Sequence, residues 1–346
     1  MSLILAAVIL AFLSWKFIEK PFRSRTLIAR KSMFIFVFAA FSATTLLGLV
    51  GHHYDKEITY LRYAGNPARA KTYIALEKAR ETSPVFIRTN RFSDGECKFS
   101  VENLSDEIAY KLSSCRKKYS SGILVIGDSH ATNLYHSLVR NTENSKDYHF
   151  LVGITKNGCH LPTEDLNCQY KEVLRFVTEN NDVFSRIIYE KAGHLMLLNS
   201  SKRDRMRDSS FRSDLFRVDE KIVDGVVSYL KNLSEQVPVV WFGPRLEPLI
   251  GDGELFHETC ESDFILSDNH KMVFTALDEY LEPRVSALDE ITYISQMQSY
   301  QFEFPRDYGS CNGLLWMDKS HFSTLGERFF GQRYNLLRND VFIQPK

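Results

Sequence analysis

The stretch ILVIGDSH, residues 123–130, joins a short aliphatic run to a Gly-Asp-Ser turn. An apolar run without alternation, ended by glycine, is typical of a strand buried on both faces of a parallel sheet. Residues 130–140 follow with Leu134, Leu138 and Val139 on one side of a helix. The stretch therefore predicts a buried strand that turns directly into a helix.

The same alternation continues to the end of the chain. Strands that alternate with helices predict an α/β fold with a parallel sheet and helices on both faces. Ligands of such sheets bind beyond the carboxyl ends of the strands. We expect this domain to span residues 120–346. Further strands are predicted at 148–155, 186–192, 238–243 and 291–295, and helices at 170–179, 216–236, 269–281 and 324–337.

Two uncharged apolar runs, residues 2–15 and 33–50, stand at the N-terminus. The segment between them, KFIEKPFRSRTLIARK, carries six basic residues and one acid, which is typical of a cytoplasmic loop between two membrane helices. A signal peptide is the less favoured alternative for residues 1–31, because no positive charge precedes the first run and no A-x-A-like cleavage site follows it. A buried core helix is the alternative for residues 33–50, and the basic loop disfavours it. We expect residues after about 52 to lie outside the cytoplasm, beginning with a polar linker over residues 53–119 that holds a short helix at 73–80.

The six cysteines all follow the second apolar run. An even number on the outer side suits an oxidising compartment, and six cysteines allow 15 pairings. We expect neighbours to pair (97–115, 159–168 and 260–311), with unpaired buried thiols as the alternative. No Cys-x-x-Cys occurs, so no metal site is expected, and no cofactor. A net charge of zero gives no basic footprint for nucleic acid.

Two motifs carry candidate chemistry. Ser129 lies where a strand enters a helix, and a helix N-terminus favours a developing oxyanion. WMDKSHFS, residues 316–323, supplies Asp318 and His321 three residues apart. A nucleophilic serine needs a base, and an imidazole needs a carboxylate that holds its tautomer. Either motif alone is also explained by turn and cap residues, but together they predict a Ser129–His321–Asp318 triad.

The strand-GDSH-helix at one end and D-x-x-H-F-S-x-x-G at the other resemble the SGNH hydrolase superfamily over residues 120–340. The resemblance implies a flavodoxin-like sheet with Ser129 as nucleophile, His321 as base and acid, and Asp318 as orienting carboxylate. It also implies oxyanion donors after the second and third strands, where Gly158 and Gly193 are the candidates. The family's G-x-N-D after the third strand is missing here.

FIEKPFR, residues 17–23, resembles the end of the family-3 membrane acyltransferase domain. Some members of that family add one membrane helix and an extracytoplasmic SGNH domain, and they O-acetylate polysaccharides such as lipopolysaccharide O-antigen. Residues 1–52 would then be the remnant of that membrane domain plus one further helix, with most of the domain missing. The resemblance implies an inner-membrane location, a periplasmic SGNH domain and an acetyl donor delivered from the membrane side.

Three functions follow from these patterns. The first is acetyl transfer through an acyl-Ser129 to a polysaccharide or glycolipid acceptor. The second is a polysaccharide O-acetyl esterase with the same triad. The third is a non-catalytic module that positions glycan for a separate acyltransferase, which the missing Asn motif favours slightly. His194 is expected to be a pocket or structural residue. Trp316 is expected to pack in the core, with stacking on a sugar as the alternative.

Overall fold

The computed structural model describes residues 11–12, 15–20, 30–83, 85, 91–93, 95–141, 150–156, 168–199, 216–250, 255, 260–261, 266 and 268–334. The chain divides into two units, residues 1–65 and 66–346.

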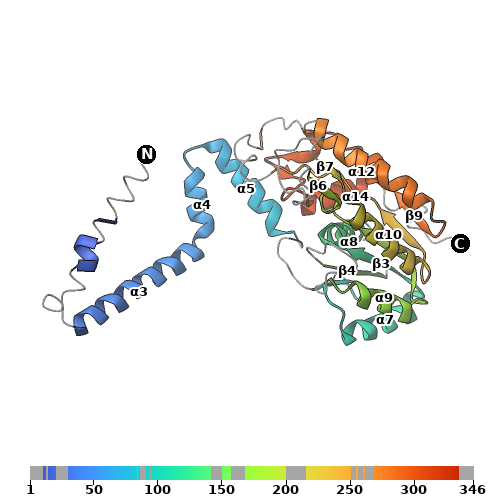
Figure 1. The fold of residues 1–346 in the computed structure, drawn as a ribbon, viewed down its shortest axis with the longest axis horizontal. Helices are drawn as coiled ribbons and strands as arrows, with labels where there is room; N and C mark the ends of the chain where they lie inside the picture. The colour runs from blue at the N-terminus through green and yellow to red at the C-terminus, as the bar shows by residue number, and fades with distance from the viewer. Residues whose placement is uncertain are drawn as a thin grey trace. The chain divides into compact units, whose positions relative to one another are not determined.

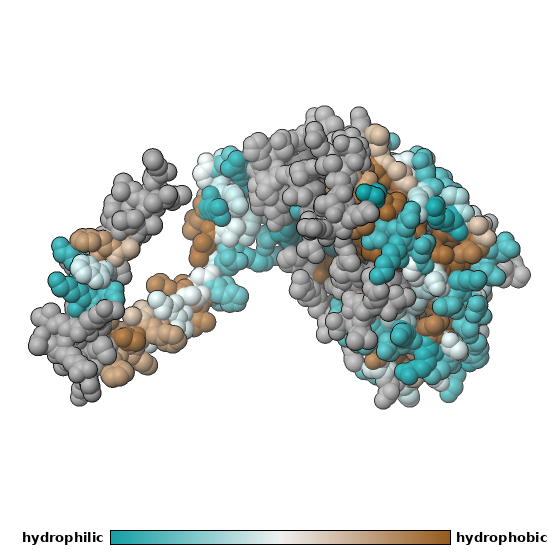
Figure 2. Space-filling view, viewed as in Figure 1, coloured by the Kyte–Doolittle hydropathy of each residue, from teal (hydrophilic) through white to brown (hydrophobic). Residues whose placement is uncertain are grey.

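The N-terminal unit is helical. It contains a π-helical turn at Trp15–Glu19, α3 (Arg30–His53) and α4 (Asp55–Tyr63). Within α3, Phe34–His53 is 20 residues long with a mean hydropathy of 2.1, and its side chains are exposed. Figure 2 shows this helix as a largely apolar segment. A helix of this length and composition can cross a membrane. The described residues offer one such helix instead of the expected two, because residues 2–10 and 13–14 of the first apolar run lie outside the described part.

The second unit is built on one sheet with the order β1-β2-β4-β3-β5-β8-β9. All neighbours are parallel except β1 and β2. The run β4-β3-β5-β8-β9 has the flavodoxin-like order 2-1-3-4-5, so the predicted α/β fold with a parallel sheet is confirmed. The strands are β1 (Arg91–Ser93), β2 (Lys98–Val101), β3 (Gly122–Gly127), β4 (Leu151–Thr155), β5 (Phe184–Glu190), β8 (Val239–Phe242) and β9 (Ile291–Ile294).

Helices cover both faces of the sheet (Figure 1). α8 and α14 pack against each other, and α9 contacts α10. Buried between them, Leu124 and Val125 of β3 are inaccessible to solvent, as the uninterrupted aliphatic run predicted. The helices are α7 (Asp106–Tyr119), α8 (Ser129–Asn141), α9 (Tyr170–Glu179), α10 (Glu220–Ser234), α12 (Asp268–Ser286) and α14 (Thr324–Tyr334).

Shorter elements join these. The predicted helix at 216–236 begins only at Glu220, because residues 216–218 form a strand that pairs with 197–199. The others are a 3₁₀ turn at Gly193–Met196, β6 (Leu197–Asn199), β7 (Phe216–Val218), α13 (Gln296–Tyr300), a 3₁₀ turn at Arg306–Tyr308, β10 (Gly309–Ser310) and β11 (Gly313–Leu314).

The expected linker over residues 53–119 differs from the structure. The second unit begins at residue 66 instead of 120. α5 (Pro67–Glu81) buries Leu76 in the core, and the Thr72 hydroxyl accepts a hydrogen bond from the backbone of Cys260 at 3.0 Å. β2 is an internal strand of the main sheet, between β1 and β4. Its four residues, KFSV, were too few to carry a strand pattern of their own.

Two of the expected disulfides are present, Cys97–Cys115 and Cys260–Cys311. Cys168 is also disulfide-bonded, whereas Cys159, its expected partner, lies outside the described residues. Disulfides persist in oxidising compartments. Together with the apolar α3, they are the features of a membrane-anchored or secreted extracytoplasmic domain.

Candidate active site

The turn from β3 into α8 places Ser129 at the first residue of the helix. Gly127 precedes it with φ +146°, a conformation that side-chain-bearing residues rarely adopt. A Cβ at this position would also collide with the backbone carbonyl oxygen of Glu190 at the end of β5. Glycine is therefore required for the two neighbouring strands to approach where the serine is presented.

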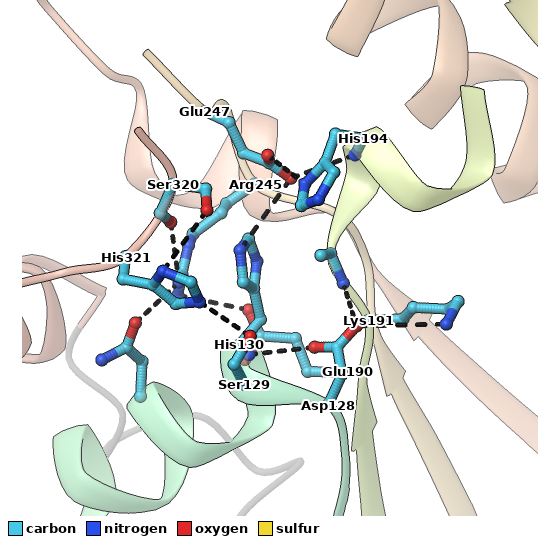
Figure 3. Close-up of polar contacts among 12 residues, drawn as sticks. Asp128, Ser129, His130, Glu190, Lys191, His194, Arg245, Glu247, Ser320 and His321 are labelled. Atoms are coloured by element: carbon cyan, nitrogen blue, oxygen red, sulfur yellow. Dashed lines mark hydrogen bonds and ion pairs between the residues drawn. The ribbon is translucent and has the colours of Figure 1, made fainter. Parts of the chain in front are cut away.

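The three residues of the expected triad lie together (Figure 3 draws Ser129 and His321). The Ser129 Oγ is 2.7 Å from Nε2 of His321. The Nδ1 of His321 is 2.8 Å from Oδ2 and 3.0 Å from Oδ1 of Asp318. Because Nδ1–H of His321 donates to the carboxylate, the unprotonated Nε2 accepts the hydrogen bond from the serine hydroxyl. This is the geometry of a nucleophile with its base and an orienting carboxylate.

Asp318 is held in its charged form. Burial by itself would raise its pKa, but His321 and the backbone N–H groups of Ser320 and His321, at 2.9 and 2.8 Å, hold the pKa well below its usual range. A carboxylate that stays ionised can stabilise the imidazolium that forms when His321 accepts a proton.

Buried side chains fix the loop that carries His321. The Oδ1 of Asn133, from α8, accepts from the backbone N–H of Phe322 at 3.0 Å, and its Nδ2 donates to the carbonyl of Phe322 at 3.3 Å. Arg245, which follows β8, donates to Oδ1 of Asn133 at 2.9 Å and to the carbonyl of Ser320 at 3.2 Å. Its guanidinium lies 3.9 Å from the ring centroid of Phe322. These contacts lock the base against the helix that carries the nucleophile.

The carboxylate of Asp128 accepts hydrogen bonds from backbone groups at the turn. It is 1% exposed, and it accepts from the backbone N–H groups of His130 and Ala192, both at 2.9 Å. The Nζ of Lys191 lies 4.0 Å from Oδ2 of the same carboxylate. Asp128 therefore joins the start of α8 to the end of β5, which is a structural role.

Of the two expected oxyanion donors, Gly158 and Gly193, the described residues include only Gly193. Gly158 lies outside the described residues. Gly193 starts the 3₁₀ turn after β5, and a Cβ there would press against Phe274 and Pro244, so close packing is one reason for this glycine. The N-terminus of α8 places the positive end of a helix dipole at Ser129. The role of Gly158 and Gly193 as donors stays a prediction.

Sequence reasoning missed a group of buried charges beside the triad, at the carboxyl ends of β5 and β8 (Figure 3). Glu190 ends β5, and burial raises its pKa to about 8 although Arg245 and Gln296 lower it. Its Oε1 accepts from Gln296 at 2.8 Å and lies 3.4 Å from Arg245. The signal that could have found this group is the polar residues directly after two apolar strands, EKAGH at 190–194 and GPRLE at 243–247.

His130, His194 and Glu247 form a second cluster next to the triad. The Nδ1 of His194 is 2.6 Å from Oε2 of Glu247, and its backbone N–H donates to Oε1 at 3.1 Å. Nε2 of His130 lies 4.0 Å from Oε1. The His130 ring is fully buried, with its centroid 5.3 Å from that of His321. Burial and the nearby Arg245 lower the pKa of His130 well below its usual value, so this imidazole is neutral at physiological pH.

Trp316 packs in the core. It is 0% exposed and its Nε1 donates to the carbonyl of Asp307 at 2.8 Å. The alternative of stacking on a sugar is therefore wrong for this residue.

No protein-family model and no curated protein matches this chain. Among solved structures it is similar to a Streptococcus pneumonia protein whose assignment as a platelet activating factor is provisional, at 11% identity and a TM-score of 0.36, covering 67% of this chain and 98% of that one. It is also similar to a carbohydrate acetylesterase family member from Sinorhizobium meliloti, at 11% identity and a TM-score of 0.38, covering 64% and 99%. At these values neither likeness identifies the fold or the function of this chain. The fold is therefore assigned from the strand order, and the site from the distances between its residues.

Proposed function

We propose that this chain is a serine acyl-transfer enzyme that moves an acetyl group onto a hydroxyl of a cell-surface polysaccharide or glycolipid through an acyl-Ser129 intermediate. The observation that carries the proposal is the hydrogen-bonded chain from Ser129 through His321 to Asp318, with contacts of 2.7 and 2.8 Å. A non-catalytic glycan module gives no reason for this alignment.

The reaction divides into two balanced halves. In the first, Nε2 of His321 takes the Ser129 proton as Oγ attacks the ester carbonyl, and the collapsing tetrahedral intermediate releases the donor alcohol with that proton. In the second, His321 takes a proton from the acceptor hydroxyl, whose oxygen attacks the acyl-serine. His321 then returns the proton to Ser129 as the new ester leaves. Water in place of the acceptor hydroxyl gives hydrolysis.

The N-terminal residues support transfer over hydrolysis. The FIEKPFR motif resembles the end of a membrane acyltransferase domain, and α3 is long and apolar enough to follow it through a bilayer. An acetyl group delivered from the membrane side, by such a domain or by a separate acyltransferase, would meet Ser129 outside the cytoplasm. The disulfides suit the periplasmic side of the inner membrane that we propose for this unit. A polysaccharide O-acetyl esterase is the second candidate, because the same triad serves it.

One experiment separates these functions. The full chain in detergent micelles is incubated with an aryl acetate, with and without an oligosaccharide acceptor, beside Ser129→Ala. Acetylated sugar that requires both acceptor and Ser129 selects transfer, whereas free acetate alone with every acceptor tried selects the esterase. Ester loss that does not differ between wild type and Ser129→Ala would remove both enzymatic functions.

A further inference from the structure

Glu247 is a fully buried carboxylate with an unusual set of partners. Two buried cations of the same group lie beside other carboxyl groups: Arg245 is 3.4 Å from Glu190, and Lys191 is 4.0 Å from Asp128. Among the described residues, the groups within ion-pair distance of Glu247 are the two imidazoles of His130 and His194. A buried carboxylate is costly unless a positive charge compensates it, so either a protonated imidazole or a bound cation is expected beside Glu247.

The second observation concerns the ring nitrogens of His130. Its ring is 0% exposed, and neither ring nitrogen has a hydrogen-bond partner among the described protein groups. Buried polar atoms are rarely left without a partner, and each exception needs an explanation. The Nε2 of His130 and Oε1 of Glu247, 4.0 Å apart, are too far apart for a hydrogen bond. A neutral imidazole with a free lone pair next to a carboxylate is what a metal ion binds.

The spacing of the three possible ligand atoms also fits a metal site. One ligand atom from each of His130, His194 and Glu247 lies within 4.8 Å of the other two. In a tetrahedral Zn²⁺ site, bonds of about 2.0–2.2 Å separate neighbouring ligand atoms by about 3.4 Å. The His194–Glu247 contact of 2.6 Å and the His130–Glu247 distance of 4.0 Å lie on either side of that value, so side-chain shifts of about 1 Å would bring the three donors to coordination distance.

We propose that His130, His194 and Glu247 bind a divalent transition metal ion, with Zn²⁺ as the best match to two imidazoles and one carboxylate. The site uses no cysteine, which is why the missing Cys-x-x-Cys pattern gave no sign of it. Three protein ligands leave one coordination position open, and His194, with its side chain 23% exposed, is the ligand nearest to solvent. The ion would lie next to the triad, because the His130 and His321 rings are 5.3 Å apart. Its charge would there favour the oxyanion that forms on the substrate.

The competing arrangement is an ion pair between Glu247 and a protonated His194, which needs no metal. It satisfies the carboxylate but leaves both nitrogens of His130 without a partner. The two arrangements differ in whether a metal binds stoichiometrically, and that is what the experiment measures.

The test uses the full chain in detergent, without a histidine tag, stripped with a chelator and titrated with Zn²⁺ by calorimetry and with Co²⁺ by visible absorption. We expect one equivalent of metal and the intense Co²⁺ bands of a four-coordinate site. Glu247→Gln and His194→Asn should each weaken binding at least about ten-fold, whereas His53→Ala, which removes an exposed imidazole on α3, should leave it unchanged. Ser129→Ala should bind metal normally, so that failure of the acyl-transfer proposal and failure of this one are distinguishable.

Absence of stoichiometric binding to wild type would overturn the metal site, and so would binding that survives Glu247→Gln but is lost in His53→Ala. The Co²⁺ spectrum of the wild type decides the matter even where a variant fails to fold, because a spectrum with only weak six-coordinate bands contradicts the proposed geometry.

Discussion

At the scale of single residues, two carboxylates hold two histidines in the same way. Asp318 accepts from both the backbone N–H and the Nδ1–H of His321, and Glu247 accepts from the backbone N–H of His194 and lies 2.6 Å from its Nδ1. Each double contact fixes the orientation of a ring and directs its Nε2 away from the carboxylate. The difference is that Ser129 lies at Nε2 of His321, which makes that histidine the candidate base.

Replacing Asp318 by Asn should therefore lower kcat/KM for an aryl acetate by about 10²–10⁴-fold, because an amide can donate to Nδ1 and stabilise the wrong tautomer. The measurement is the initial rate at several substrate concentrations. Asp289→Asn, an exposed change after α12, is the matched control and should leave the rate unaltered. Equal rates for Asp318→Asn and wild type would mean that the carboxylate does not orient a catalytic base.

His136 gives a pH prediction. It is 2% exposed, and burial, with a further contribution from Arg140, lowers its pKa from 6.5 to about 3. Between those values the unfolded chain binds a proton that the native state does not, so His136 makes the free energy of unfolding fall as pH falls from 6.5 to 3. The slope from one such group is about 1.4 kcal/mol per pH unit.

The buried Glu190 and Glu327 have pKa values raised to about 8 and about 7, and they oppose this slope because the native state binds protons where the unfolded chain has released them. The comparison of His136→Gln with wild type isolates the histidine. Urea unfolding at pH 7, 5 and 4 should show a flatter pH dependence in the variant. Parallel curves for the two proteins would contradict the assignment of a neutral buried His136.

At the scale of elements, the β3–α8 turn determines both the fold and the position of the nucleophile. Gly127→Ala should destabilise the second unit by several kcal/mol, because alanine disfavours φ +146° and its Cβ meets the carbonyl of Glu190. Gly225→Ala, within α10, is the control: nothing lies within 4 Å of its Cβ position, and the change should stabilise by about 0.5–1 kcal/mol. Thermal unfolding of the two variants should shift in opposite directions. A stable Gly127→Ala protein would show that the turn tolerates a side chain.

This turn was readable from sequence because its signals are local: an aliphatic run, a glycine and a serine at a helix start. The Asp318–His321 pair was readable for the same reason. Glu190, Arg245 and Glu247 were not, because Glu190 ends β5 whereas the other two follow β8, and only the order β3-β5-β8 brings these strand ends to the β3–α8 turn. β2 was missed because four residues carry too little periodicity to separate a strand from a polar loop.

At the scale of the whole molecule, the second unit begins at α5 and not at β3. A chain that starts at Asn66 should unfold in one cooperative transition, whereas a chain that starts at residue 120 should not fold stably. The shorter chain loses β2 beside β4, the Cys97–Cys115 disulfide and the apolar face of α5. Circular dichroism during heating distinguishes them. Cooperative unfolding of the shorter chain at the same temperature would contradict this prediction and would mean that residues 66–119 are a linker outside the folded domain.

The proposed function depends on a covalent step at Ser129. Its most direct test is the mass of the full chain after brief exposure to an aryl acetate and quenching in acid, followed by peptide mapping. We predict a gain of one acetyl group on the peptide that contains Ser129, and we predict that this gain is absent in Ser129→Ala and reduced in His321→Ala. Acetylation that maps to another residue, or that persists in Ser129→Ala, would contradict the assignment of Ser129 as the nucleophile.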